Sequence, residues 1–243
     1  MNITEARLEY QLCSTENSGL PVIIVAAGSF TRMQGVNKQL LEIGGVSVIA
    51  RTMLAFEQSK AIKNIILVVR PDDLFDMQLL AEKYNISKLT DIVCGGATRQ
   101  ESVLRGFERI GEDKTVLIHD GARPFVSEKI ICDVAEALKE YPAVTCAVRV
   151  KDTIKQVDSD GKVVKTLDRD SLVAVQTPQG VWVKEYLDAA QKAGDVSDFT
   201  DDTSLMEWAG YEVYTTQGSY KNIKITTPED VSAAESFSCE TED

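Results

Sequence analysis

The chain alternates strand-length apolar runs with helix-length amphipathic stretches, and this alternation limits the available folds more than any other feature. The run from Val22 to Ala27 is apolar at every position and stops at Gly28. The run from Ile65 to Val69 has the same character. Strands that are apolar throughout are typical of a parallel sheet covered by helices on both faces. We therefore expect a three-layer α/β fold with a mostly parallel central sheet.

The same alternation of apolar runs and amphipathic stretches places the individual strands and helices. Strands are expected at 21–26, 64–69, 90–94, 115–119, 143–150, 173–176, 211–215 and 222–226. Helices are expected at 47–58, 72–84, 98–110, 127–140, 183–193, 201–209 and 228–237. Proline and acidic residues at 71–73 and 228–230, and Ser127 at 127–128, are typical of helix starts. Residues 20–238 are expected to form one domain, preceded by a tail at 1–19.

One segment, 151–169, does not fit a three-layer domain. Asp160 and Gly161 lie between two stretches of alternating residues, which predicts a β-hairpin. An isolated two-stranded ribbon is only marginally stable in water. The segment is therefore either a loose surface excursion or a β-arm that packs on a second subunit and makes the protein a homodimer.

Charge and composition exclude several classes of partner. The net charge of −12 argues against nucleic acid and against an anionic membrane. No apolar run approaches the roughly 20 residues of a membrane span. Residues 1–19 are polar and lack the apolar core of a signal peptide, so we expect a cytoplasmic protein. The five cysteines have no paired spacing, which indicates neither a disulfide framework nor a zinc site.

Two loops after predicted strands are candidates for anion binding. The loop 28–38 carries Arg32 and Lys38 but no acidic residue, although the chain as a whole is acidic. It matches neither a Walker A loop nor GxGxxG. The segment 94–103 places a glycine pair before Thr98, a candidate helix cap, with Arg99 and Ser102 in the first helical turns. The alternatives are a plain surface turn with solvated cations and an ordinary strand–helix connection.

Further polar residues lie at or near predicted strand ends. Asp120 ends a buried strand and is a candidate for binding a metal, a hydroxyl group or Arg123. His119 is the only histidine, and its role is either structural or catalytic. Lys224 lies among apolar residues; if it points inward it must find an anion, and otherwise it is solvated. Either Thr200 or Asp201 is expected to cap the helix at 201–209.

Taken together, the candidate residues are mainly cations. Nucleotidyl and phosphoryl transfer need such a set, because their transition states spread negative charge over phosphate oxygens. A phosphate monoester has a second pKa of about 6, so it is mostly ionised at pH 7 and needs no general base as a nucleophile. The converging cations are Arg32, Lys38, Arg99, Arg123, Arg169 and Lys224.

Eight motifs in order resemble the 2-C-methyl-D-erythritol 4-phosphate cytidylyltransferases of the non-mevalonate isoprenoid pathway. They are "AAGSFTRMQGVNKQ", "GGATRQESV", "HDGARPF", "DTIKQV", "TLDRDSL", "QTPQ", "TDDTSLMEWAG" and "NIKITTPED". The resemblance runs from about residue 20 to 237. It implies a Rossmann-like nucleotidyltransferase fold in which the arm at 151–169 forms a homodimer. It also implies that CTP and a sugar-alcohol phosphate react, with Mg2+ as cofactor, to a cytidine-diphosphate alcohol and pyrophosphate.

The resemblance also implies a role for each matching residue. The catalytic group is Arg32, Lys38, Arg169 and Lys224. The nucleotide pocket is Ala26, Ala27, Gly28, Ser29, Gly96, Arg99 and Ser102. The alcohol phosphate is held by Asp120, Arg123, Thr153, Thr177 and Thr200, with Thr153 and Arg169 reaching over from the partner's arm. Mg2+ is expected mainly on triphosphate oxygens, with Asp120 as the candidate protein ligand.

Two positions depart from the family's pattern, and two other functions compete with the one it implies. Asn37 stands where members often have proline, which bears on loop stiffness, and Ala97 stands where many have an acid. One rival is a ribitol 5-phosphate cytidylyltransferase, which resembles this family in the same loops. The other is a non-catalytic nucleotide-binding dimer.

Overall fold

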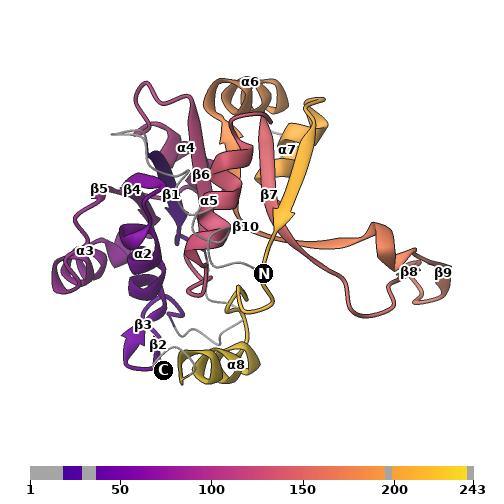
Figure 1. Cartoon of the computed structure of the whole chain (residues 1–243), viewed down its shortest axis with the longest axis horizontal. Coiled ribbons are helices and arrows are strands. Elements are labelled where there is room, and N and C mark those ends of the chain that lie inside the picture. Colours follow the sequence, from indigo (N-terminus) through magenta and orange to yellow (C-terminus); the bar gives the residue numbers. More distant parts are fainter. Residues whose placement is uncertain (1–18, 29–36, 195–198, 240–243) are drawn as a thin grey trace, which may run out of the picture.

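The computed structural model describes residues 19–28, 37–194 and 199–239 (Figure 1). In this part of the chain a seven-stranded sheet has the order β11-β7-β10-β6-β1-β4-β5. All neighbours are parallel except β10, which runs antiparallel to both β6 and β7. The strands are β1 (Leu20–Val25), β4 (Ile62–Val69), β5 (Leu89–Cys94), β6 (Thr115–Asp120), β7 (Ala143–Arg149), β10 (Val173–Trp182) and β11 (Val213–Gln217).

Helices cover both faces of this sheet and make the three expected layers. One face packs on α2 (Val48–Gln58), α3 (Leu74–Lys83) and α5 (Glu128–Ala137). The other packs on α4 (Arg99–Phe107), α6 (Val183–Ala193) and α7 (Asp202–Trp208). In β1, Val22 and Ile24 face the first core and Ile23 faces the second, and all three are fully buried. A strand with two buried faces must be apolar throughout, as the sequence predicted.

A small third cluster closes one end of the domain. Helix α8 (Pro228–Cys239) packs there beside the short strands β2 (Glu42–Ile43) and β3 (Val46–Ser47) (Figure 1). Ile43, Ile225 and Ala234 are its buried side chains, together with Val48 at the start of α2. Within the described ranges, no helix combines the length and apolar character needed to cross a membrane.

The predicted hairpin is present and projects from the body of the domain (Figure 1). Strands β8 (Lys155–Val157) and β9 (Val163–Thr166) pair antiparallel. Asp158 Oδ1 closes the turn by accepting from the amides of Asp160 (3.1 Å) and Lys162 (2.9 Å). Gly161 has φ +82°, a conformation that favours glycine. Gly161 of the Asp160-Gly161 pair therefore marked the turn correctly, because the turn needs a residue that tolerates a positive φ.

Two strand predictions were wrong in detail. Residues 222–226 do not form a strand, and their polar groups bond elsewhere: Asn222 Nδ2 donates to Thr177 O of β10 (2.8 Å), and Ile225 N donates to Ala122 O after β6 (2.8 Å). The strand expected at 173–176 continues to Trp182 as β10, with a shift of pairing register between Val175 and Gln179 that accommodates the proline.

The predicted helix starts are confirmed with one refinement. Thr98 and Ser127 each accept a hydrogen bond from the amide three residues later. Of the two candidates at the start of α7, Asp201 is the cap, and its carboxylate accepts from Ser204 N at 2.8 Å. The helix expected at 72–84 begins as a single 3-10 turn, Pro71–Asp73, and continues as α3.

Candidate active site

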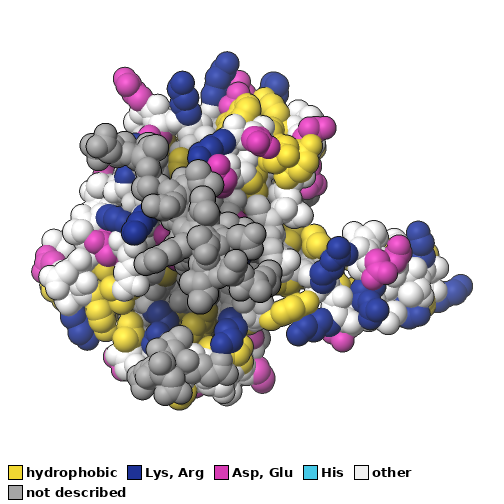
Figure 2. Space-filling view, in the orientation of Figure 1, with side chains coloured by type: hydrophobic (Ala, Val, Ile, Leu, Met, Phe, Trp, Pro, Cys, Tyr) yellow, Lys and Arg dark blue, Asp and Glu magenta, His cyan; other side chains and the backbone are white. Residues whose placement is uncertain are grey.

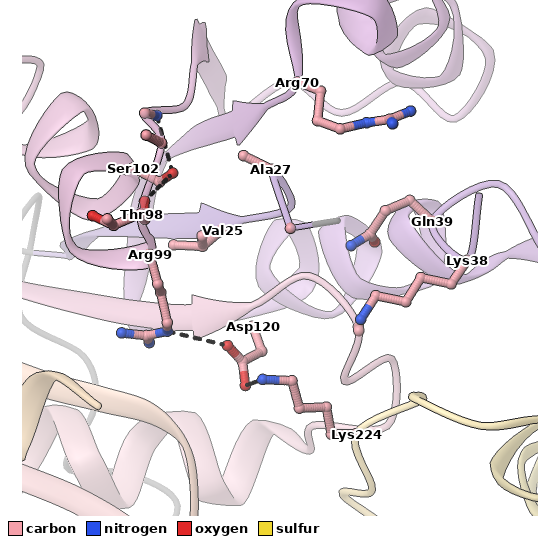
Figure 3. Close-up of a pocket in the computed structure, with 14 residues that line it drawn as sticks. Val25, Ala27, Lys38, Gln39, Arg70, Thr98, Arg99, Ser102, Asp120 and Lys224 are labelled. Atoms are coloured by element: carbon pink, nitrogen blue, oxygen red, sulfur yellow. Dashed lines mark hydrogen bonds and ion pairs between the residues drawn. The ribbon is translucent and has the colours of Figure 1, made fainter. Parts of the chain in front are cut away.

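A cavity of about 480 Å³ opens where β1, β4, β5 and β6 end at the carboxyl edge of the sheet (Figure 3). Ligands of open α/β sheets bind at this edge. Four cationic side chains and one carboxylate lie in the described part of its wall. The cations are Lys38, Arg70, Arg99 and Lys224, and the carboxylate is Asp120. A cavity with this balance suits a polyanion.

The first loop brings backbone rather than side chains to the cavity. Ala26 N still donates to Val68 O (2.7 Å) and its side chain is buried, whereas Ala27 and Gly28 line the cavity. Among the described residues other than its chain neighbours, none has an atom within 4 Å of where a Cβ on Gly28 would be, so this part of the wall leaves room for a ligand near the backbone. Lys38 lies in the segment before β2 and lines the cavity. Its side chain extends toward Lys224 and Asp120 (Figure 3).

The second loop needs both of its glycines. A Cβ on Gly95 would lie 2.4 Å from Ala27 Cβ, and one on Gly96 would lie 2.3 Å from Glu101 Cβ. Ser102 Oγ accepts from Gly96 N (3.1 Å), and Glu101 Oε2 accepts from Ala97 N (2.7 Å). These bonds fix the loop before any ligand arrives. They also place the Glu101 carboxylate beside Ala97, where the sequence itself carries no acid.

Asp120 is the centre of an ion cluster. Its Oδ2 lies 2.9 Å from Lys224 Nζ and 3.4 Å from Arg123 Nε, and its Oδ1 lies 3.8 Å from Arg99 Nε. Burial alone would raise the carboxyl pKa, but the three cations, Lys224 foremost, hold the pKa of Asp120 well below its usual range. The carboxylate is therefore ionised at neutral pH. Lys224 points inward, and Asp120 is the anion that this orientation requires.

Arg99 is held from behind the cavity wall. Its Nη2 donates to Asp202 Oδ2 at 2.6 Å, and the second oxygen of Asp202 accepts from the hydroxyl of Tyr186 at 2.9 Å. Asp202 is only 2% exposed. Burial works against the charge, yet the nearby carboxylates of Asp202 and Asp120 raise the pKa of Arg99 above its ordinary value. The guanidinium is thus a fixed, permanent charge on the wall.

Comparison with known proteins decides the family. The model of the family IspD, 2-C-methyl-D-erythritol 4-phosphate cytidylyltransferase, matches residues 20–239. The chain belongs to this cytidylyltransferase family. It is 47% identical over 223 residues, 91% of this chain and 97% of that protein, to a 2-C-methyl-D-erythritol 4-phosphate cytidylyltransferase of Halalkalibacterium halodurans. A homologue of the same name from Clostridium novyi is 45% identical over 88% of this chain and 94% of that protein.

Solved structures agree with the sequence relatives. The crystal structure of 4-diphosphocytidyl-2C-methyl-D-erythritol synthase from Anaerococcus prevotii superposes with a TM-score of 0.81 at 35% identity, covering 91% of this chain and 96% of that one. The Thermus thermophilus 2-C-methyl-D-erythritol 4-phosphate cytidylyltransferase gives a TM-score of 0.73 at 28% identity, over 91% and 99% of the two chains. The cytidylyltransferase fold therefore extends over nearly the whole chain.

The cavity of this cytidylyltransferase-family chain contains many of the residues that the sequence analysis selected. The predicted residues that line it are Ala27, Gly28, Lys38, Gly96, Arg99, Ser102, Asp120 and Lys224. Those not selected are Val25, Gln39, Arg70, Ala97, Thr98 and Ala122. Arg70 is the main omission, because it adds a cation. It follows a buried strand, which is a usable signal, but none of the eight motifs quoted above contains it.

The other selected residues have different positions. Arg123 and Thr177 contact Asp120 from behind the wall: Arg123 through its side chain, and Thr177 through an Oγ1 that accepts from Asp120 N at 3.0 Å. Thr200 is exposed just before α7 and does not line the cavity. Thr153 and Arg169 are exposed on the arm. Ser29 and Arg32 lie outside the described residues.

His119 has a structural role in this chain. It is fully buried, and its ring meets Phe56 edge-on with 4.8 Å between centroids. Nε2 lies 3.1 Å from Arg123 O, a pure acceptor, so Nε2 carries the proton. Nδ1 then accepts from Thr177 Oγ1 at 3.1 Å. The neutral imidazole fits this network, and it does not line the cavity.

The buried imidazole makes stability depend on pH. Burial lowers the pKa of His119 to about 4, against about 6.5 in an unfolded chain, so the unfolded state binds more protons between these values. The contribution of neutral His119 is present above pH 6.5 and is lost as pH falls toward 4. Relative to His119→Gln, we expect the free energy of unfolding of the native chain to drop by about 2 kcal/mol from pH 7 to pH 5.

Urea unfolding at a series of pH values measures this difference. Because the chain has a single histidine, NMR titration of the folded protein gives its pKa without an assignment problem. A midpoint near 6.5 in the folded state, or parallel stability curves for the native chain and His119→Gln, contradicts the structural role.

Proposed function

We propose that the chain transfers the cytidylyl group of CTP to 2-C-methyl-D-erythritol 4-phosphate, giving 4-diphosphocytidyl-2-C-methyl-D-erythritol and pyrophosphate. The observation that carries the proposal is the cation-lined cavity at the carboxyl edge of the sheet, in a chain that belongs to this cytidylyltransferase family. A nucleoside triphosphate and an alcohol phosphate are both polyanions, and such a wall counters their mutual repulsion.

The chemistry asks for charge placement rather than proton removal. An ionised oxygen of the alcohol phosphate attacks the α-phosphorus of CTP, the bond from that phosphorus to the β-phosphate oxygen breaks, and pyrophosphate leaves. Lys38 and Lys224 extend into one cavity and stabilise the charge that builds on the phosphate oxygens. No step needs a histidine, and His119 is buried outside the cavity. The prebuilt loop at 95–98 supplies the wall for the nucleotide.

A divalent cation such as Mg2+ fits this site only with help from the substrate. Among the described residues, no group of three or more His, Cys, Asp or Glu side chains is arranged to hold a metal ion. Asp120 is the one carboxylate in the described cavity wall, and three cations already surround it. Triphosphate oxygens and water would therefore supply most ligands, with Asp120 as the single protein ligand. When bound, the ion neutralises phosphate charge.

Pyrophosphate release tests the reaction and its substrate in one assay. With CTP and Mg2+, the purified chain should release pyrophosphate when 2-C-methyl-D-erythritol 4-phosphate is added, and much less with ribitol 5-phosphate. Faster turnover of the ribitol compound would reassign the substrate. Nucleotide binding without pyrophosphate release, with either alcohol phosphate, would support the non-catalytic dimer. Cell fractionation tests the cytoplasmic location, which is part of the same proposal.

We further infer that the arm makes the protein a homodimer and completes the partner's site. Figure 2 shows the arm projecting from the domain, with Lys and Arg side chains along it. Val157, Val163 and Val164 on the arm are each more than half exposed, which a free hairpin does not favour. Two hydrogen bonds join the two sides of the arm at its root: Arg169 Nη1 donates to Lys151 O (3.1 Å), and Leu167 N donates to Ile154 O (3.0 Å). A rigid arm with exposed valines suits a second copy of the chain as partner.

Mixing two inactive variants tests the shared site. In a heterodimer of Lys38→Ala and Arg169→Ala chains, one site keeps both residues and the other has neither. Random subunit exchange should therefore restore about a quarter of wild-type activity. Each variant alone stays inactive and serves as the control. Heterodimers demonstrated by mass, but without recovered activity, would refute the contribution of Arg169 across the dimer.

A further inference from the structure

The side chain of Asn37 ties the segment that carries Lys38 to the 3-10 turn Pro71–Asp73, which follows β4. Asn37 Nδ2 donates to Asp73 Oδ1 at 3.0 Å, while Asn37 Oδ1 accepts from Gln39 N at 3.1 Å. Leu40 N donates to the main-chain oxygen of Asn37 at 3.1 Å. The amide of Asn37 thus makes one long-range bond and one local bond. Lys38 lies between Asn37 and Gln39, the two residues that the local bond joins.

The acceptor of the long-range bond is itself fixed. Asp73 is 4% exposed, and Arg70 holds both of its oxygens, through Nε to Oδ2 (2.9 Å) and Nη2 to Oδ1 (2.9 Å). A bidentate pair of this kind defines the plane of the carboxylate. Arg70 directly follows β4, which is paired on both sides in the sheet, and it lines the same cavity as Lys38. The chain of contacts therefore runs from the rigid sheet to the lysine segment.

The other side of Lys38 is anchored in the core. Gln39 is 2% exposed, and its main-chain oxygen accepts from Ile49 N of α2 at 3.1 Å. With Asn37 fixed on one side and Gln39 on the other, the main chain at Lys38 has little freedom. From this anchored main chain the side chain of Lys38 extends into the cavity (Figure 3). A cation held in this way loses less conformational entropy when it binds a phosphate.

We propose that Asn37 is a positioning residue: held by the Arg70-clamped carboxylate of Asp73, it sets the place of Lys38 for phosphate chemistry. The inference rests on the proposed function and adds three residues to it that carry no assigned role in the reaction. Asn37 reaches the sheet through a hydrogen-bond relay, so a tertiary contact adds to the local hydrogen bonds that order this segment.

Three variants separate the relay from general stability. Asn37→Asp keeps the acceptor for Gln39 N but turns the donor into a second carboxylate facing Asp73. The exchanged pair Asn37→Asp/Asp73→Asn keeps the net charge and restores a donor–acceptor pair in the opposite sense. Asn64→Ala is the matched control, since Asn64 also bonds through its side chain, to Thr90, but away from the cavity.

Two readouts are needed, and one of them does not involve turnover. For Asn37→Asp we expect kcat to fall by at least about tenfold with little change in the KM for the alcohol phosphate. Amide hydrogen exchange at Gln39 and Leu40 should be faster by about tenfold. The exchanged pair should recover part of both quantities, because the bond between positions 37 and 73 returns while the two-oxygen clamp by Arg70 does not. Asn64→Ala should alter neither quantity. If the exchanged pair does not fold, Arg70→Lys replaces it, read by hydrogen exchange alone because Arg70 itself lines the cavity. One ammonium cannot hold both oxygens of Asp73, so exchange at Gln39 and Leu40 should again be faster.

The outcomes distinguish this inference from the proposed function. Unchanged exchange and unchanged kcat in Asn37→Asp would overturn the relay while the wild-type activity stands. Faster exchange with normal kcat would show that the relay orders the segment without positioning Lys38, and this too overturns it. A loss of kcat that the exchanged pair does not repair even in part assigns the effect to the added charge at position 37 and overturns the relay. A wild-type chain that releases no pyrophosphate refutes the proposed function, while hydrogen exchange still decides whether Asn37 holds the segment.

Discussion

Lys38→Ala is expected to lower kcat by about a hundredfold or more, with a folded protein and an intact nucleotide wall. One preorganised cation beside a reacting phosphorus is worth several kcal/mol when water is largely excluded. Lys38 enters the cavity from a segment anchored at Asn37 and Gln39, so its charge is in place before substrate binds. Steady-state kinetics of pyrophosphate release, with CTP and alcohol phosphate varied separately, measure the loss.

Two further variants determine whether the effect belongs to this charge. Lys192→Ala removes an exposed lysine from the last turn of α6, outside the cavity, and should leave kcat unchanged. Lys38→Arg keeps the charge but changes its shape and reach, so it should recover part of the rate. Near-normal turnover by Lys38→Ala would remove Lys38 from the reaction and leave Lys224 and Arg99 as the cavity's principal charges.

The sequence predicted the layers of this fold because the relevant signals are local. Strand β1 is apolar throughout since both of its faces are buried, and Thr98 and Ser127 cap helices through bonds three residues away. The strand predicted for the segment 222–226 was wrong because that prediction also rested on local composition. Its composition suits a strand, but Asn222 and Ile225 bond to residues about 45 and 100 positions away, and no local pattern reports such contacts.

The candidate site, too, has features that the sequence predicts and features that it does not. Arg99 lies just after β5 and Asp120 ends β6, and the carboxyl ends of these strands lie at the same edge of the sheet, so topology places both residues there once the sheet is predicted. Lys38 and Lys224 come from segments outside the main sheet, and local composition and the family's motifs, not the topology, selected them. The contacts that orient them are not visible in the sequence. Asp202 holds Arg99 from 103 positions away, and Asn37 reaches Asp73 across 36 positions. A motif can therefore name the charges of a site but not the partners that aim them.

Lys224→Ala is expected to lower kcat/KM by about a hundredfold or more, for two reasons that can be separated. The first is loss of a cation from the cavity. The second is that Asp120 loses its nearest partner, the ammonium at 2.9 Å, and then presents a less compensated carboxylate to the phosphates. The same loss should raise the pKa of Asp120 toward its usual range, because Lys224 is the cation that lowers it most.

A double-mutant cycle with Asp120→Asn isolates the second reason. With the carboxylate neutral, removing Lys224 costs the cation but exposes no opposing charge, so Lys224→Ala should be less harmful in that background, by about 1 kcal/mol or more of coupling. Lys221→Ala is the matched control, as an exposed lysine three residues earlier that does not line the cavity. A loss for Lys224→Ala no larger than that of the control contradicts its role. Strict additivity would mean that Lys224 acts on phosphate alone and that its pairing with Asp120 has no part in transfer.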